Sequence, residues 1–204
     1  MELSIIRPPK LVVALDIGST YSGYAWQNMV EFKDRREINF NTIWKAGAVQ
    51  LHKTKTCLMI KYKDKYYASG RPMDKSSLHL DPDEIEDVRI GNFAENTYMK
   101  IAKKESHKLL GKYYLFSRFK MRLYEEKFHD KMMVEDQLSQ PLPLFDVMTL
   151  FIGELKKHCL QKIKGKRQTT IDEKETLFVV TVPAIWSESA KEFMRKAAIA
   201  VRII

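Results

Sequence analysis

The chain has 204 residues, of which 45% are hydrophobic and 11% aromatic, and its formal net charge is +9. This length and composition are typical of one globular core or two small subdomains and exclude a large multidomain protein. The apolar runs are far shorter than the ~20 residues that cross a bilayer, and residues 1–10 lack the apolar stretch of a secretory signal. We therefore expect a cytoplasmic protein without membrane contact, in which Cys57 and Cys159 are reduced thiols.

The first predicted elements are two strands, over residues 11–16 and 22–27, which flank a polar break. The charged stretch at 31–37 is predicted to be a connecting turn. Residues 56–62 and 65–69 are predicted to form a hairpin about a short polar turn.

The middle of the chain carries helix signals. A helix should begin at residues 81–84, where a cap-forming aspartate precedes a proline and further acids. A second helix fits residues 144–163, because apolar side chains recur on one face and Gly165 lies just past its end. The polar stretch at 165–176 is predicted to be a surface loop.

A short buried strand is predicted at 177–182, and after a break at Pro183 comes the clearest periodic signal in the chain. Ser187 can cap this last helix, and Ser189 with Glu192 has the spacing of a capping box. No glycine, proline or polar turn ends the helix before the sequence stops, which suggests a chain cut from a longer fold. The apolar face of the helix consists of Ala190, Phe193, Met194, Ala197, Ala198 and Val201.

Basic residues are concentrated between Lys100 and Lys127, where nine Lys and Arg accompany three Glu. The aromatic residues interleaved with them would suit base stacking by a nucleic-acid binder. A solvated basic helix whose aromatic residues face the core explains the same pattern. We favour this helix and disfavour nucleic acid as a partner, because no zinc-finger, ribonucleoprotein or basic-zipper motif is present. The aromatic residues are Tyr98, Tyr113, Tyr114, Phe116 and Phe119.

The break between the first two strands has a composition that suits phosphate. Gly18 lets the backbone approach a ligand closely, the amide hydrogens of the turn can point together, and the Ser19 and Thr20 hydroxyls add donors. Asp16, at the end of the first strand, can hold the water shell of a magnesium ion, which takes only one or two carboxylates from a protein. On spacing alone, an ordinary polar hairpin turn remains the alternative.

Four segments of the sequence resemble one family. The segment VVALDIGSTYSGYAW (12–26) is similar to the first phosphate-binding hairpin of the actin-like ATPase fold. The segment FVVTVPAIWSESAKEFMRKAA (178–198) is similar to the strand, proline and helix that follow in the 70-kilodalton heat-shock proteins. The segments HLDPDE (79–84) and FKMRLY (119–124), with the tryptophan of VPAIW, resemble the divergent branch called heat-shock 70 kDa protein 12. The resemblance touches most of residues 11–201, in the same order.

The resemblance implies an α/β protein that forms the first lobe of an actin-like, ribonuclease H-like ATPase domain. This lobe would contain a mixed five-stranded sheet with flanking helices and a small second subdomain. The resemblance places an N-terminal tail at 1–10, the lobe at 11–204 and the smaller subdomain at 50–130, with the second lobe absent. We expect such a lobe alone to bind ATP weakly and to turn over little of it, because half of the contacts to the nucleotide are missing.

Residue by residue, the resemblance implies a nucleotide site at the first hairpin. Asp16 would lie near the metal. Lys120 would be catalytic, because the matching lysine orients the attacking water and offsets charge on the transferred phosphoryl group. Pro183 would couple the nucleotide state to a partner domain. The implied ligands are ATP or ADP and magnesium, which is held through phosphates and water. The residues that would line the phosphates, with Asp16, are Gly18, Ser19, Thr20 and Tyr21.

The implied function is that of an ATP-binding protein of the heat-shock 70 kDa protein 12 type, with slow magnesium-dependent hydrolysis in the full-length form. A chaperone-like or scaffold role with a protein partner is also implied. Two departures from the family pattern bear on the site: the segment 88–112 is longer than expected, and Thr54-Lys55-Thr56 stands where Thr-Pro-Thr is frequent. The alternatives are a non-catalytic protein-interaction module, a basic nucleic-acid binder and a metabolite kinase of the same fold.

Overall fold

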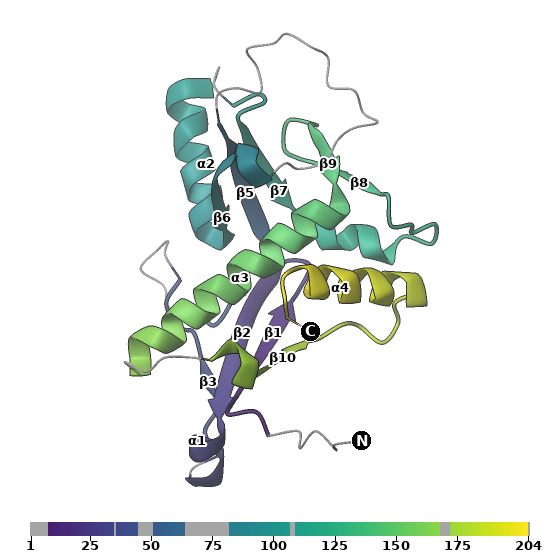
Figure 1. Cartoon of the computed structure of the whole chain (residues 1–204). Coiled ribbons are helices and arrows are strands. Elements are labelled where there is room, and N and C mark those ends of the chain that lie inside the picture. The colour runs from purple at the N-terminus through teal and green to yellow at the C-terminus, as the bar shows by residue number, and fades with distance from the viewer. Residues whose placement is uncertain are drawn as a thin grey trace.

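A mixed five-stranded sheet forms the lower half of the computed structural model in Figure 1. β1 (Leu11–Ile17) pairs antiparallel with β2 (Tyr21–Asn28) and parallel with β10 (Thr176–Val180). The short strands β3 (Asn39–Phe40) and β4 (Thr54–Lys55) both pair antiparallel with β2. The residues that the structure describes are 8–34, 36–44, 51–63, 82–106, 109–167 and 172–203.

A second sheet of three antiparallel strands lies above the first one in Figure 1, in the order β6-β5-β7. It consists of β5 (Cys57–Tyr62), β6 (Ile85–Ile90) and β7 (Tyr113–Ser117). Helix α2 (Gly91–Glu105) contacts all three strands. This sheet and its helix fall within the range predicted as a smaller subdomain, and the division of the chain into domains stays a prediction.

Helix α3 (Leu144–Arg167) crosses between the two sheets and contacts both, so that it joins them through a common core (Figure 1). Helix α4 (Glu188–Ala200) packs against α3. The small hairpin of β8 (Met133–Glu135) and β9 (Pro141–Pro143) leads directly into α3. Among the helices of the described ranges, none combines the length and the apolarity that crossing a bilayer would require.

The burial patterns of two strands explain where the core lies. In β1 every second side chain is buried, as expected for a strand with one face on the core. In β5 consecutive side chains are buried, because this strand has apolar neighbours on both faces. Leu58 and Ile60 join the main core, whereas Cys57 and Met59 pack in a smaller cluster with residues of α2.

The α/β class and the mixed sheet predicted from the sequence are confirmed. The two opening strands, the strand before Pro183 and the long helix from residue 144 are present close to their predicted bounds. The last helix begins as predicted, because the Ser187 hydroxyl accepts a hydrogen bond from the Ala190 N–H at 3.2 Å. Ser189, which has capping-box spacing, instead lies with its hydroxyl 2.9 Å from that of Ser187.

The prediction that a helix begins at residues 81–84 is wrong. The described residues Pro82–Glu84 form a single 3-10 turn that leads into β6. Proline and acids do provide a helix start, but the β-branched Ile85, Val88 and Ile90 follow at once, and such residues favour strands. The hydrogen-bonded ladder with β5 then outweighs the weak local preference for a helix.

The connecting turn predicted at 31–37 is also different, because α1 (Met29–Asp34) follows β2 without a break. Asn28 explains this start. Its side-chain oxygen accepts a hydrogen bond from the Glu31 N–H at 2.6 Å, which satisfies a donor that the first helical turn would otherwise leave unpaired.

The end of the long helix was predicted one turn too early. Gly165 lies inside α3, and its backbone does not adopt the left-handed conformation of a helix-ending glycine. The loop predicted at 165–176 contains the 3-10 turn Glu173–Glu175, which precedes β10. The strand predicted at 65–69 lies outside the described residues.

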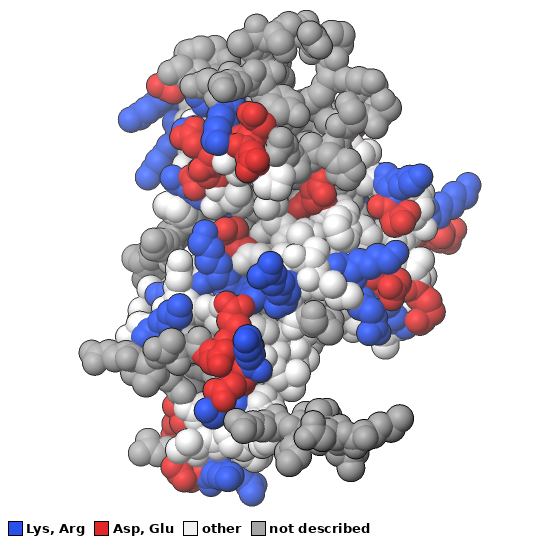
Figure 2. Space-filling model, viewed as in Figure 1, with Lys and Arg blue, Asp and Glu red and all other residues white. Residues whose placement is uncertain are grey.

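The aromatic residues of the basic region lie mainly in the core. Tyr98, Tyr114, Phe116 and Phe119 are at most 3% exposed, so they are not available to stack on bases. The interpretation as a basic helix with an aromatic residue facing the core is therefore confirmed for α2, which carries Tyr98. On the face shown in Figure 2, Lys and Arg alternate with Asp and Glu over the described residues, and no large patch of one sign forms there.

Both cysteines are buried free thiols, Cys57 in the cluster with α2 and Cys159 in the main core. Burial raises the pKa of each thiol from an ordinary value near 9 to about 12. Below pH 9 both the folded and the unfolded thiols keep their protons, and between pH 9 and 12 only the unfolded chain releases them. Stability is therefore lost across that interval, and we expect about 2–3 kcal/mol per thiol by about pH 11.

Urea denaturation near neutral pH and again at about pH 11, with a reducing agent present, measures this loss. Cys57→Ala should remove about half of the pH-dependent part contributed by the two thiols, although the smaller side chain lowers stability at every pH. An unchanged pH dependence in this variant would show that the Cys57 thiol is not one of its sources.

Candidate functional site

The turn between β1 and β2 brings two backbone segments into close contact. The Gly18 N–H donates a hydrogen bond to the Tyr21 carbonyl at 3.1 Å. A Cβ at position 18 would lie 2.2 Å from that carbonyl oxygen, so the position requires glycine. The register places Ile17 opposite Ser22, which leaves only four residues to reverse the chain.

Thr56, between β4 and β5, forms hydrogen bonds to two carbonyl groups of the turn. Its N–H donates to the Thr20 carbonyl at 2.8 Å, and its hydroxyl donates to the Gly18 carbonyl at 2.7 Å. The same hydroxyl lies 2.7 Å from that of Ser22. Within the described part of the chain, the N–H groups of Ser19 and Thr20 have no acceptor. Two such donors at adjacent positions suit an anion.

Lys120 reaches the turn from a distant part of the sequence. Its side chain is buried, and its ammonium group donates to the carbonyl of Ile17, immediately before the turn. The same group lies 4.7 Å from the centroid of the Trp186 ring, a cation–π contact. Burial lowers the pKa of Lys120, and the nearby Asp16 carboxylate opposes this decrease.

The local sequence explains how a lysine comes to be buried here. The 3-10 turn Phe119–Tyr124 begins after Arg118, whose φ of 55° is left-handed. This conformation turns the chain sharply at the end of β7. Phe119 then packs edge-to-face on Phe151 of α3, with ring centroids 5.4 Å apart. The burial of Phe119 fixes the position of Lys120 beside it.

Asp16 lies at the carboxyl edge of the sheet, where ligands bind in open α/β folds. One carboxylate oxygen accepts from the Lys53 ammonium group, and the other lies 3.4 Å from the Thr181 hydroxyl. Thr181 follows β10, which is parallel to β1, so the two residues end neighbouring strands on the same side. The Asp16 and Lys53 side chains are 48% and 50% exposed, and a ligand in solution can therefore reach them.

A magnesium ion beside Asp16 would meet two ammonium groups, that of Lys53 in direct contact and that of Lys120 nearby. Among the described residues, His, Cys, Asp and Glu form no group of three or more that could hold a metal. A carboxylate already paired with a lysine is a poor ligand for a second cation. The residues present do not fit a divalent ion at Asp16 while this ion pair is intact, and the metal implied by the resemblance stays a prediction.

The structure brings Asp16, the glycine turn and Lys120 together, although the hydrogen bond from Lys120 to β1 spans 103 positions. Tyr21 contributes its carbonyl to the turn, and its side chain is 46% exposed. Pro183 is half-buried in the segment between β10 and α4. The roles of these residues toward a nucleotide stay predictions.

Sequence reasoning missed three residues at this site: Lys53, Thr56 and Thr181. Thr56 belongs to a stretch that was noted only as a departure from a family pattern. Thr181 directly follows β10, within the predicted strand, and only the parallel pairing of β1 with β10 brings it to Asp16. No pattern in the sequence around Lys53 indicates that it contacts Asp16, because that contact depends on the register of β4 against β2.

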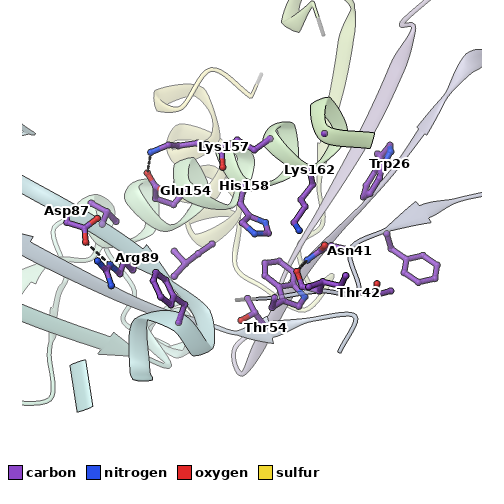
Figure 3. A pocket seen from close by; sticks show the side chains of 18 residues that line it. Trp26, Asn41, Thr42, Thr54, Asp87, Arg89, Glu154, Lys157, His158 and Lys162 are labelled. Atoms are coloured by element: carbon purple, nitrogen blue, oxygen red, sulfur yellow. Dashed lines mark hydrogen bonds and ion pairs between the residues drawn. The ribbon is translucent and has the colours of Figure 1, made fainter. Parts of the chain in front are cut away.

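A separate cleft of about 780 Å³ opens between β6, the segment after β3 and the C-terminal half of α3 (Figure 3). His158 and Lys162 extend from α3 toward it, and the Tyr24 hydroxyl lies 2.8 Å from His158 Nδ1. The volume suits a small molecule. Neither Asp16 nor Lys120 lines this cleft, so the predicted phosphate site lies elsewhere.

The fold and the arrangement of the site can be compared with those of known protein classes. A mixed sheet, a glycine turn at the carboxyl edge of its first strand and a buried lysine against that turn are consistent with a fragment of an actin-like nucleotide-binding protein. No family model matches the chain.

Three curated relatives carry the name of one branch, heat shock 70 kDa protein 12. The chain is 28% identical over 192 residues to heat shock 70 kDa protein 12B of Homo sapiens. It is 24% identical over 200 residues to heat shock 70 kDa protein 12A of Homo sapiens and of Mus musculus. Each match covers 92% of this chain and 24% of the relative, so the chain spans about a quarter of the length of the curated relatives it matches. The resemblance to the heat-shock 70 kDa protein 12 branch is confirmed.

Proposed function

We propose that the chain forms the phosphate-binding lobe of an ATP-binding domain with the actin-like, ribonuclease H-like fold. One observation carries the proposal: the Lys120 ammonium group is buried against the carbonyl of Ile17, directly before a turn with free N–H donors among the described residues. A buried cation beside such donors attracts a polyanion. The relationship to the heat shock 70 kDa protein 12 sequences supports the same proposal.

In the proposed complex, the N–H groups of Ser19 and Thr20 bind phosphate oxygens, and their hydroxyls add further donors. Gly18 keeps the turn narrow enough for both N–H groups to face the ligand. Lys120 holds its charge near the phosphoryl group that is transferred and orients the attacking water. Positioning and electrostatic stabilisation of this kind supply nearly all of the catalysis in phosphoryl transfer.

The remaining parts of the proposal rest on the resemblance alone. They are slow ATP hydrolysis in the longer relatives, a chaperone-like or scaffold role with a protein partner, and a cytoplasmic location. A non-catalytic interaction module with the same fold stays the alternative, and it would retain partner binding in a full-length protein that does not hydrolyse ATP.

Calorimetric titration with ATP, inorganic triphosphate and adenosine tests the proposed site. We expect ATP and triphosphate to bind with a Kd of roughly 10 μM to 1 mM, since a few contacts to phosphate supply the affinity. Adenosine should not bind measurably, because the turn and Lys120 recognise phosphate. Triphosphate should displace ATP, which would show that both occupy one site.

Two results would contradict this assignment. Adenosine that binds as tightly as ATP would locate recognition at the base, away from the turn. The absence of binding by both ATP and triphosphate would overturn the proposed function. Sub-micromolar ATP binding would show that the chain alone makes more contacts than the phosphate site provides.

A further inference from the structure

Asp16, Gly23 and Lys53 form a row across the carboxyl edge of the five-stranded sheet. The pairing of β1 with β2 places Asp16 opposite Gly23. Ser22 of β2 lies opposite Thr54 of β4, and the Cα atom of Lys53, the residue before β4, is 3.6 Å from where a Cβ of Gly23 would be. The edge of the sheet therefore presents an acid, a glycine and a lysine side by side.

The glycine in the middle of this row lets the two charged side chains meet. A Cβ at Gly23 would lie 3.1 Å from the Cγ atom of Lys53 and 3.0 Å from the His52 carbonyl oxygen. The stem of Lys53 thus passes over the glycine, and its ammonium group contacts Asp16 on the far side of β2. Lys55, two positions along, pairs with Glu95 of α2 at 2.5 Å.

The charges at this edge favour an anion over a divalent cation. Two ammonium groups, from Lys53 and Lys120, lie near the single carboxylate of Asp16 and leave a net positive charge. The ion pair between Lys53 and Asp16 is half exposed, and pairs of this kind exchange partners at little cost. Lys53 is therefore free to turn toward a phosphate oxygen while it remains close to Asp16.

We propose that Lys53 supplies the positive charge that a magnesium ion would otherwise bring, so that this site binds the triphosphate group of a nucleotide without a divalent metal. The Lys53 ammonium group would contact the phosphate on the Asp16 side of the turn, and Lys120 would contact it from the Ile17 side. This inference rests on the proposed function, because it concerns the same phosphate ligand.

The test compares ATP and inorganic triphosphate binding to the full chain in excess EDTA and in excess magnesium. The wild-type Kd should differ by less than about threefold between the two buffers, whereas Lys53→Met should raise the metal-free Kd by about tenfold or more. Magnesium should restore much of the binding by Lys53→Met, because Asp16 is then free to hold the water shell of the ion. Lys55→Met is the matched control, and its metal-free Kd should stay at the wild-type value.

Each outcome decides between the inference and the proposed function. Wild-type binding that requires magnesium and does not change in Lys53→Met overturns the inference and leaves the proposed function intact. The absence of wild-type binding in both buffers overturns both. If thermal unfolding shows that Lys53→Met is not folded, Lys53→Arg takes its place: it keeps the charge and should keep metal-free binding, and loss of that binding in a folded protein contradicts the inference.

Discussion

Gly18→Ala should abolish triphosphate binding and lower the free energy of unfolding by about 2–4 kcal/mol. The added Cβ would lie 2.2 Å from the Tyr21 carbonyl oxygen, which is a backbone atom and has no side-chain freedom to move away. The turn must open, and the hydrogen bond from the Gly18 N–H to that carbonyl is lost. The N–H groups of Ser19 and Thr20 then no longer face the same ligand.

Gly165→Ala is the control for this variant. Gly165 lies within α3, and a Cβ there would meet no other described residue within 4 Å beyond the neighbouring backbone of its own helix. Because alanine is the better helix former, this variant should be more stable than wild type by up to about 1 kcal/mol and should bind triphosphate normally. Urea denaturation and calorimetry of both variants measure the two effects. Normal triphosphate binding by Gly18→Ala would show that the turn is not the phosphate site.

Lys120→Met should raise the Kd for triphosphate by about tenfold or more while changing stability much less. Two effects on stability oppose each other. The variant no longer buries an ammonium group, which favours folding, but it leaves the Ile17 carbonyl without its hydrogen-bond donor. The side chain of methionine is apolar and flexible, so it can remain against the Trp186 ring.

The pH dependence of the free energy of unfolding, compared between wild type and Lys120→Met, isolates the contribution of Lys120 from that of the other titratable groups. Burial lowers the pKa of Lys120, so at neutral pH both states are protonated and the folded chain carries the cost of a buried charge. As the pH rises through the lowered pKa, the folded chain releases its proton first and that cost disappears. Wild type should therefore gain stability relative to Lys120→Met as the pH rises toward 10.5. A constant difference in urea denaturation across this range would contradict a buried, charged Lys120.

The glycine turn was predictable from the sequence, because its requirements are local. Four residues decide whether the backbone can close at Gly18, and they are adjacent in the chain. The same holds for Ser187, whose cap involves a partner only three positions away. Lys120 was found through the family resemblance. Composition and spacing alone do not distinguish it from other lysines of the basic region.

The parts that could not be predicted depend on pairing between distant segments. The residues after Pro82 carry both helix and strand signals, and the choice is made by β5, which offers a ladder to β6. Lys53 reaches Asp16 only because β4 adopts one register against β2, and a shift of one residue would place it on the other face. Such registers follow from the packing of the whole sheet.

The parallel pairing of β1 with β10 determines when this edge of the sheet can form during synthesis. Asp16 and Thr181 lie 165 positions apart, and contacts of such separation form only after a long loop has closed. During synthesis the glycine turn leaves the ribosome early, whereas the strand that completes its edge emerges late. A ligand that needs this edge stabilises only chains that already contain β10. Such a ligand would therefore act only after β10 has paired with β1 and would give little help to the nascent N-terminal hairpin.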